Sequence, residues 1–220
     1  VVLFDFRFPN VAFNLHSMLN SLFKGPLSGR YRYAAPQLGF DSRNTINFVE
    51  MGGVSKYSLT LKPGEKQSVQ LVFNVAKDYK LGVYPGRIIV SSPITKKIIT
   101  TIVEVESSKK IFDVDIKIQD KEIVRGTNLI AEIVIFNLGQ DLGRVDTQVE
   151  IGMKDLDGNI IQKEENRIAV QTQASFTESI LVPKYLEEGR YVAYAIVTFD
   201  GEIGTASEVF EVISRPAGFL

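Results

Sequence analysis

The chain of 220 residues lacks cysteine and tryptophan and has a single histidine, His16. Without cysteine it can form neither disulfides nor Cys-ligated zinc or iron–sulfur sites. One imidazole is also too few for a zinc site built on histidines. Because no acidic residue lies within a helical turn of His16 in the sequence, we interpret it as a surface residue and not as a catalytic base.

Net charge and long apolar runs are also missing. The 25 basic residues nearly balance the 26 acidic ones, for a net charge of −1. We therefore expect no nucleic-acid partner and no attraction to an anionic membrane. No run reaches the ~18 apolar residues of a membrane span, so we expect no direct membrane insertion of this segment. The opening VVLFDFRF has no initiator methionine and no signal-peptide layout, and we expect any anchor to lie outside this chain.

The sequence shows no catalytic or cofactor-binding constellation. Acidic pairs such as Glu164-Glu165 lie in solvent-facing contexts, and no glycine-rich loop has nucleotide-binding spacing. In KDLDGN, Asp155, Asp157 and Asn159 resemble the start of a calcium loop, but Asn166 stands where the twelfth-position glutamate belongs. We interpret this stretch as a hairpin turn. The sequence therefore predicts no enzyme activity, no cofactor and no metal.

What the chain does have is period-two alternation with β-branched residues, which is typical of half-buried strands. In the C-terminal half seven short strands alternate with Gly-, Asn- and Asp-containing turns, a pattern that favours an immunoglobulin-like sandwich. The predicted strands are Ile111–Gln119, Leu129–Asn137, Arg144–Lys154, Asn159–Val170, Ala174–Val182, Arg190–Phe199 and Thr205–Ile213.

The N-terminal half repeats this plan more loosely. Sliding the chain by 107 residues places Gly82 on Gly189 and Tyr84 on Tyr191, so we predict that one supersecondary unit occurs twice. In immunoglobulin-like sandwiches a tyrosine at this point bonds its hydroxyl to backbone across a corner. The predicted strands are Val1–Phe8, Asn44–Glu50, Ser55–Leu61, Gln67–Val75, Gly86–Ser92 and Lys97–Val105.

Residues 9–40 do not follow the strand pattern. Apolar side chains at helical spacing predict a helix at Val11–Phe23, ended by Gly25 and Pro26. After it, basic and aromatic residues alternate at Arg30, Tyr31, Arg32 and Tyr33. We interpret these four residues as a candidate interaction surface. One interpretation is that this insertion covers an open end of the first sandwich. Others are docking of the helix to a neighbouring subunit or a membrane interface, and contact of the Arg–Tyr run with a glycan or an anionic ligand by aromatic stacking and charged hydrogen bonds.

The polar run Ser107-Ser108-Lys109-Lys110 is the natural linker. The sequence thus predicts an all-β protein of two tandem immunoglobulin-like antiparallel β-sandwiches. The first spans residues 1–107, with the helix and loop insertion at about 9–40, and the second spans residues 108–220.

Two stretches resemble known modules. The run LKPGEKQSVQLVFNVAKDYKLGVYPGRIIVSS resembles immunoglobulin-like modules of archaeal and bacterial cell-surface proteins. Asp113–Val212, with FNLG at Phe136–Gly139 and the KDLDGNII hairpin, is similar to the adhesion-type modules called CARDB. The resemblance implies a non-catalytic, extracellular or surface-exposed module of a larger anchored protein, and it transfers no binding residue.

We therefore expect a structural or interaction segment of a prokaryotic cell-surface or secreted protein. It would act as a spacer or a protein–protein interaction module, with a protein partner or self-assembly through sheet edges. The alternative is a carbohydrate-binding or accessory module of an extracellular enzyme, for which Tyr31 and Tyr33 are the supporting residues.

Overall fold

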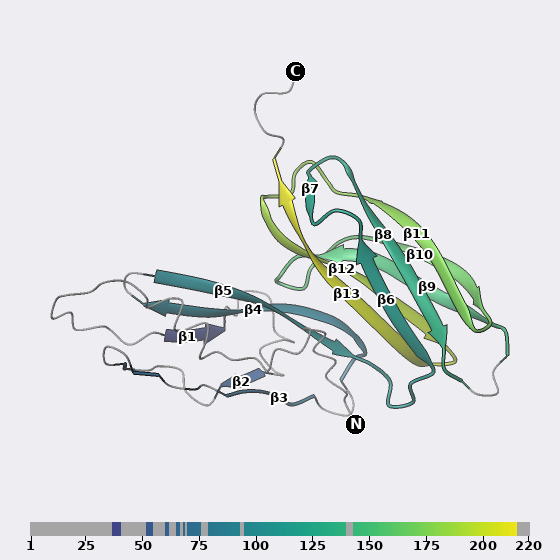
Figure 1. Cartoon of the computed structure of the whole chain (residues 1–220), viewed down its shortest axis with the longest axis horizontal. Coiled ribbons are helices and arrows are strands. Elements are labelled where there is room, and N and C mark those ends of the chain that lie inside the picture. The colour runs from purple at the N-terminus through teal and green to yellow at the C-terminus, as the bar shows by residue number, and fades with distance from the viewer. Residues whose placement is uncertain are drawn as a thin grey trace, which may run out of the picture. The chain divides into compact units, whose positions relative to one another are not determined.

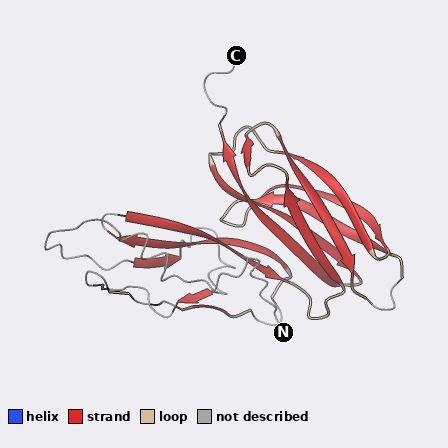
Figure 2. Cartoon of the chain, viewed as in Figure 1, coloured by secondary structure: helices blue, strands red, loops and turns tan. Residues whose placement is uncertain are grey.

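The computed structural model describes residues 37–40, 52–54, 60–61, 65–66, 68, 70–75, 79–92, 95–139 and 143–214. Every regular element in these ranges is a β-strand, and none of them is a helix (Figure 2). The strands form several antiparallel sheets, so the predicted all-β class is confirmed. The helix predicted at Val11–Phe23 lies outside the described residues.

The chain divides into two compact units. Among the described residues, the C-terminal unit comprises residues 79–86 and 102–214. The N-terminal unit comprises the described residues up to 75 together with 87–92 and 95–101. A segment before residue 87 and the residues from 102 onward therefore belong to one compact body, although some fifteen positions of the other unit separate them in sequence.

In the N-terminal half, strands β1 (Gln37–Phe40), β4 (Gly82–Ser92) and β5 (Thr95–Val105) form one sheet in the order β1-β4-β5. Strands β2 (Gly52–Val54) and β3 (Leu71–Phe73) form another. β1 pairs antiparallel with β4, from Gln37 opposite Ser91 to Phe40 opposite Ile88.

Several predictions for this half need correction. The last four residues of the predicted insertion form strand β1. This strand is too short to show an alternating pattern, and Gly39 interrupts it. Thr60 and Leu61, predicted to end a strand, are not in one. Among the described residues of the strand predicted at Gln67–Val75, only those of β3 are in a strand. β4 and β5 both begin earlier than predicted. The strands predicted at Val1–Phe8 and Asn44–Glu50 lie outside the described residues.

The C-terminal unit contains two sheets that pack face to face (Figure 1). The larger has the order β10-β9-β12-β13-β7, and the smaller has the order β11-β8-β6. Their strands are β6 (Phe112–Ile118), β7 (Glu122–Val124), β8 (Asn128–Asn137), β9 (Val145–Lys154), β10 (Ile160–Val170), β11 (Gln173–Leu181), β12 (Gly189–Phe199) and β13 (Glu202–Ile213).

All seven strands predicted for this half occur, within a few residues of the predicted limits. β7 was not predicted. It is only three residues long and pairs parallel with β13, so it has too few positions to show a period.

One apolar core fills the space between the two sheets because alternate side chains of each strand point inward. β8 shows this most clearly: its odd-numbered residues from Leu129 to Ile135 are buried, and its even-numbered ones are at least partly exposed. Gly86 and Ala193, the small residues two positions after Tyr84 and Tyr191, are both buried.

The corners that open β4 and β12 share the same local structure 107 residues apart. Gly82 and Gly189 open β4 and β12 with φ of 148° and 145°, a conformation that side chains with a Cβ rarely adopt. Tyr84 donates its hydroxyl hydrogen bond to the Lys80 carbonyl at 2.5 Å, and Tyr191 donates to the Glu187 carbonyl at 3.0 Å. Each tyrosine thus bonds the backbone four residues earlier, as the corner interpretation predicts.

Candidate functional site

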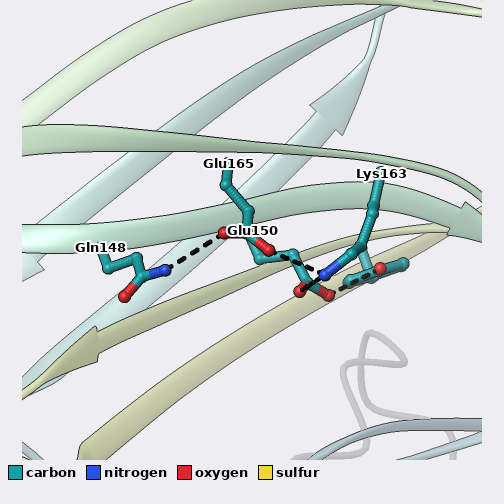
Figure 3. Close-up of polar contacts among 5 residues, drawn as sticks. Gln148, Glu150, Lys163 and Glu165 are labelled. Atoms are coloured by element: carbon teal, nitrogen blue, oxygen red, sulfur yellow. Dashed lines mark hydrogen bonds and ion pairs between the residues drawn. The ribbon is translucent and has the colours of Figure 1, made fainter.

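The residues predicted as an interaction surface, Arg30, Tyr31, Arg32 and Tyr33, all lie outside the described residues. The described part of the chain offers a different candidate, a polar network on the outer face of the larger sheet (Figure 3).

Strand alternation builds this network. Val149, Ile151 and Met153 of β9 point into the core and are fully buried. Glu150 and Gly152, between them, therefore lie on the opposite face of the sheet. Antiparallel pairing then sets Glu165 of β10 directly opposite Glu150, and both Lys163 of β10 and Tyr194 of β12 opposite Gly152.

Lys163 resolves the repulsion between the two glutamates. Like charges directly opposite in an antiparallel pair destabilise it. The Lys163 Nζ lies 2.8 Å from Glu150 Oε2 and 2.8 Å from Glu165 Oε1, so one cation bridges the two carboxylates and offsets their mutual repulsion (Figure 3). Its hydrogen bonds to Glu150 and then Glu165 raise the pKa of Lys163, and the same contact lowers the pKa of Glu165. Gln148 adds a hydrogen bond to Glu165 at 3.3 Å.

Tyr194 joins the network from the neighbouring strand. Its side chain is fully buried, and its hydroxyl donates a hydrogen bond to Glu150 Oε1 at 2.8 Å. Burial, followed by this hydrogen bond, raises the pKa of Tyr194. The ring lies across Gly152, where an added Cβ would stand 2.8 Å from the tyrosine hydroxyl oxygen. Glycine is needed at position 152 because the aromatic ring occupies the space of a side chain.

Lys154 connects this face to the start of β4. Its Nζ donates a hydrogen bond to the Val83 carbonyl at 2.8 Å and lies 4.8 Å from the centroid of the Tyr194 ring. Burial lowers the pKa of Lys154, and the nearby Glu150 acts in the opposite direction. Val83 packs with Val192 and Tyr194 in a small buried cluster on this outer face. Val83, at the start of β4, thus covers part of the larger sheet.

The chemistry of the network suits fixation of strands better than proton transfer. A general acid or base works best with a pKa near the working pH. Here the pKa of Lys163 rises and that of Glu165 falls, while Tyr194 is held in its neutral form. These pKa shifts keep Lys163 positively charged, Glu165 negatively charged and Tyr194 neutral. The network therefore ties β9, β10 and β12 together in one register.

A second set of side chains bonds backbone groups along the edges of β6 and β13. The Glu208 carboxylate accepts a hydrogen bond from the Ile118 N–H at 2.5 Å and pairs with Lys121. Glu106 accepts from the Thr205 N–H at 2.8 Å. The hydroxyl oxygen of Ser107, the first residue of the predicted linker, accepts from the Ile203 N–H at 2.6 Å. Backbone donors on β6 and β13 are thereby satisfied.

The two motifs behind the CARDB resemblance are structural. In FNLG, the Asn137 Nδ2 donates to the carbonyls of Gly143 and Gln171 at 3.0 and 2.8 Å, and its Oδ1 accepts from the Gly139 N–H. This amide joins three loop segments.

In KDLDGN, the Asp155 carboxylate accepts from the backbone N–H groups of Asp157 and Asn159 at 2.9 and 2.8 Å. Because the loop's own donors engage it, this carboxylate shapes the β9–β10 hairpin, as predicted. The described residues contain no group of three or more His, Asp or Glu side chains placed to hold a metal ion.

Sequence reasoning did not identify Glu150, Lys163 or Tyr194. A signal was present in β9, where Glu150-x-Gly152-x-Lys154 places two charges and a glycine on one face. That pattern shows an outward polar stripe, but not which strands flank it.

Comparisons with known proteins gave weak likenesses. No protein-family model and no curated protein matches the chain. Among solved structures, the chain is similar to the CARDB domain of the PF1109 protein from Pyrococcus furiosus in complex with di-metal ions. The identity is 17%, 46% of this chain and 87% of that chain are covered, and the TM-score is 0.34.

A solution NMR structure of the same CARDB domain matches at 19% identity, over 48% of this chain and 96% of that chain, with a TM-score of 0.34. The sporulation control protein Spo0M from Bacillus subtilis matches at 11% identity, over 48% of this chain and 51% of that chain, with a TM-score of 0.39. At such identities and TM-scores, no ligand or activity of these proteins is transferred to this chain.

Among the described residues, no helix has the length and apolarity to cross a membrane.

Proposed function

We propose that the chain is a non-catalytic structural segment of a prokaryotic cell-surface or secreted protein, built from two tandem immunoglobulin-like sandwiches. It acts as a spacer or as a protein–protein interaction module, anchored through parts of the protein outside this chain. The corner motif that recurs at Tyr84 and Tyr191 supports a duplicated sequence unit, because both tyrosines bond the backbone four residues earlier and each lies two residues after a glycine of positive φ, 148° at Gly82 and 145° at Gly189.

The observation that carries the proposal is the use of charged side chains in the C-terminal unit. Glu150, Lys163 and Glu165 bond one another across strands, and Glu106 and Glu208 bond backbone N–H groups at strand edges. Side chains used in this way hold strands in register and block unwanted edge pairing. A module that must keep its shape outside the cell benefits from both effects.

Mechanical stretching of the whole chain tests the spacer role. Single molecules pulled from their two ends in a force spectrometer should extend in two discrete steps, one for each proposed sandwich. A sandwich of roughly 110 residues should release about 40 nm of chain, at about 3.6 Å per residue. A smooth extension without steps at low force would contradict a spacer role.

Localisation has its own test. An antibody raised against the C-terminal unit should label intact cells of the source organism, and external protease should remove the label. Labelling that appears only after the cells are lysed would exclude the surface location.

The carbohydrate-binding alternative rests on Tyr31 and Tyr33 in the sequence. A glycan array with the chain and its Tyr31→Ala variant distinguishes the two functions. Binding that the variant loses would favour the alternative, whereas absent or unchanged binding would remove its support.

A further inference from the structure

The edges of the two sheets in the C-terminal unit differ in how they are protected. An exposed strand edge offers unpaired N–H and C=O groups to any other strand, and proteins blunt such edges with charges, bulges, short strands or cover. β10, at one edge of the larger sheet, has two of these devices. Its register shifts between Ile160 and Gln162, and its exposed middle carries Lys163, Glu164, Glu165 and Arg167.

Three further edges are also blunted. β7, at the other end of the larger sheet, is only three residues long. The stretch of β13 beyond β7 is covered by Ser107 and Glu106, which bond the N–H groups of Ile203 and Thr205. On β6, the N–H of Ile118 donates a hydrogen bond to the carboxylate of Glu208.

β11 is different. It is the outer strand of the smaller sheet, and no described strand pairs with its outer side. It runs from Gln173 to Leu181 opposite β8 without a register shift. Its single charged residue, Glu178, is partly buried and accepts a hydrogen bond from Asn166 Nδ2 at 2.9 Å. β11 is therefore regular, uncharged on its exposed face, and long enough to receive another strand.

The direction of its backbone groups follows from the hydrogen bonds at its ends. The Thr172 carbonyl accepts from the Asn137 N–H, and the Val182 N–H donates to the Thr127 carbonyl, so even-numbered residues bond the β8 side. Because hydrogen-bonding direction alternates along an antiparallel strand, the odd-numbered residues point their N–H and C=O groups outward. These residues are Gln173, Ser175, Thr177, Ser179 and Leu181, all with exposed side chains.

We propose that β11 pairs antiparallel with β11 of a second copy of this chain, about a two-fold axis at Thr177. This register is self-complementary. Thr177 lies opposite its own copy, Ser175 opposite Ser179, and Gln173 opposite Leu181. All five outward-facing residues then form hydrogen-bonded pairs, for about ten backbone bonds between the copies.

The side chains agree with this pairing. Cross-strand Thr–Thr and Ser–Ser pairs are favourable, and no like charges face each other. Leu181, whose side chain is 52% exposed, gains the methylene groups of Gln173 as a neighbour. The two smaller sheets join into one continuous sheet. This inference names a second copy as the partner for the interaction role proposed above and rests on that role.

Sedimentation equilibrium of the whole chain over a concentration series tests the pairing. The wild-type chain should associate reversibly into dimers. Thr177→Pro removes the outward N–H donor without touching the bonds to β8, and proline is tolerated at such edge positions. Because two intermolecular hydrogen bonds are lost, self-association should weaken by about tenfold or more. Thr177→Val retains the backbone donor and should still dimerise.

Charge exchange at position 177 then tests the two-fold register. Thr177→Lys and Thr177→Glu should each be monomeric, because like charges meet at the axis. An equimolar mixture of the two should recover dimers. Circular dichroism of each variant verifies that the strands are intact, and a variant that fails to fold is replaced by Ser175→Lys mixed with Ser179→Glu.

Amide hydrogen exchange distinguishes the other occupants. The N–H groups of Ser175, Thr177 and Ser179 should exchange slowly at high concentration and rapidly on dilution. A wild-type monomer at every concentration overturns the pairing, as do dimers that persist in Thr177→Pro. Protection that is independent of concentration overturns it too, because another segment of the same chain would then cover β11. None of these results affects surface labelling or the force steps, so the two proposals fail separately.

Discussion

Gly152→Ala is expected to destabilise the C-terminal unit strongly, although it adds only one methyl group on the outer face of a sheet. The new Cβ would stand 2.8 Å from the Tyr194 hydroxyl oxygen and 3.0 Å from its Cε1, and would also crowd the Gln162 carbonyl of the neighbouring strand. Contacts this short do not occur, so the ring or the β9–β10 pairing has to shift.

The size of the effect follows from two contributions. Overpacking a well-packed site costs about 1–3 kcal/mol. Displacing the Tyr194 ring also breaks its 2.8 Å hydrogen bond to the Glu150 carboxylate, and bonds to charged groups are worth about 1.5–3 kcal/mol. Because both contributions involve the same ring they are not additive, and we expect a loss of about 2–4 kcal/mol in the free energy of unfolding.

Urea unfolding monitored by circular dichroism measures this loss, with hydrogen exchange of the β9 amides assigning the transition to the C-terminal unit. Tyr194→Phe serves as the partner variant, because it removes the hydroxyl and keeps the ring. In the Phe background, Gly152→Ala should cost less, since no hydroxyl remains to be displaced. A cost below about 0.5 kcal/mol in the wild-type background, as at an ordinary surface position, would refute the reasoning.

Three further predictions concern the same unit. Burial raises the pKa of Tyr194 above its ordinary value of about 10, so the folded state binds the phenol proton more tightly than the unfolded chain does. The free energy of unfolding should therefore fall as the pH rises above about 10. Urea titrations at each pH measure this dependence, and Tyr194→Phe should make it less steep. Glu208→Ala leaves the Ile118 N–H without its acceptor, so it should lower the free energy of unfolding by about 1–3 kcal/mol. It should also increase aggregation, measured by light scattering, because a strand edge is uncovered. The matched Glu211→Ala, at an exposed position of the same strand, should have neither effect. Tyr191→Phe removes the corner hydrogen bond and should lower the free energy of unfolding by about 1 kcal/mol; an unchanged value would show that the corner contributes nothing.

Local patterns account for the parts of the fold that sequence reasoning predicted. The strands of the C-terminal half are long enough to alternate visibly and are separated by Asp-Gly and Glu-Gly turns. The corner tyrosines were predictable because their acceptor lies only four residues away in the same turn. β7 and β1 were missed because three or four residues show no period.

The polar network was not predictable for a different reason. Glu150 and Lys163 meet because β9 and β10 pair in one particular register, and Tyr194 arrives from a strand some forty residues later. Glu106 and Thr205 are still further apart in sequence. Contacts of this kind depend on which strands become neighbours, and one sequence does not specify that on its own.

The bonds from Glu106 and Ser107 to β13, and from Lys154 to the carbonyl of Val83, have a practical consequence for recombinant work. A fragment that starts at residue 108, where the polar run invites a cut, would lose every one of them and expose fresh backbone donors along β13. Anyone wishing to crystallise this half by itself should begin upstream of residue 79. The same holds for domain shuffling, since a cassette cut at the polar run would arrive without part of its own cover.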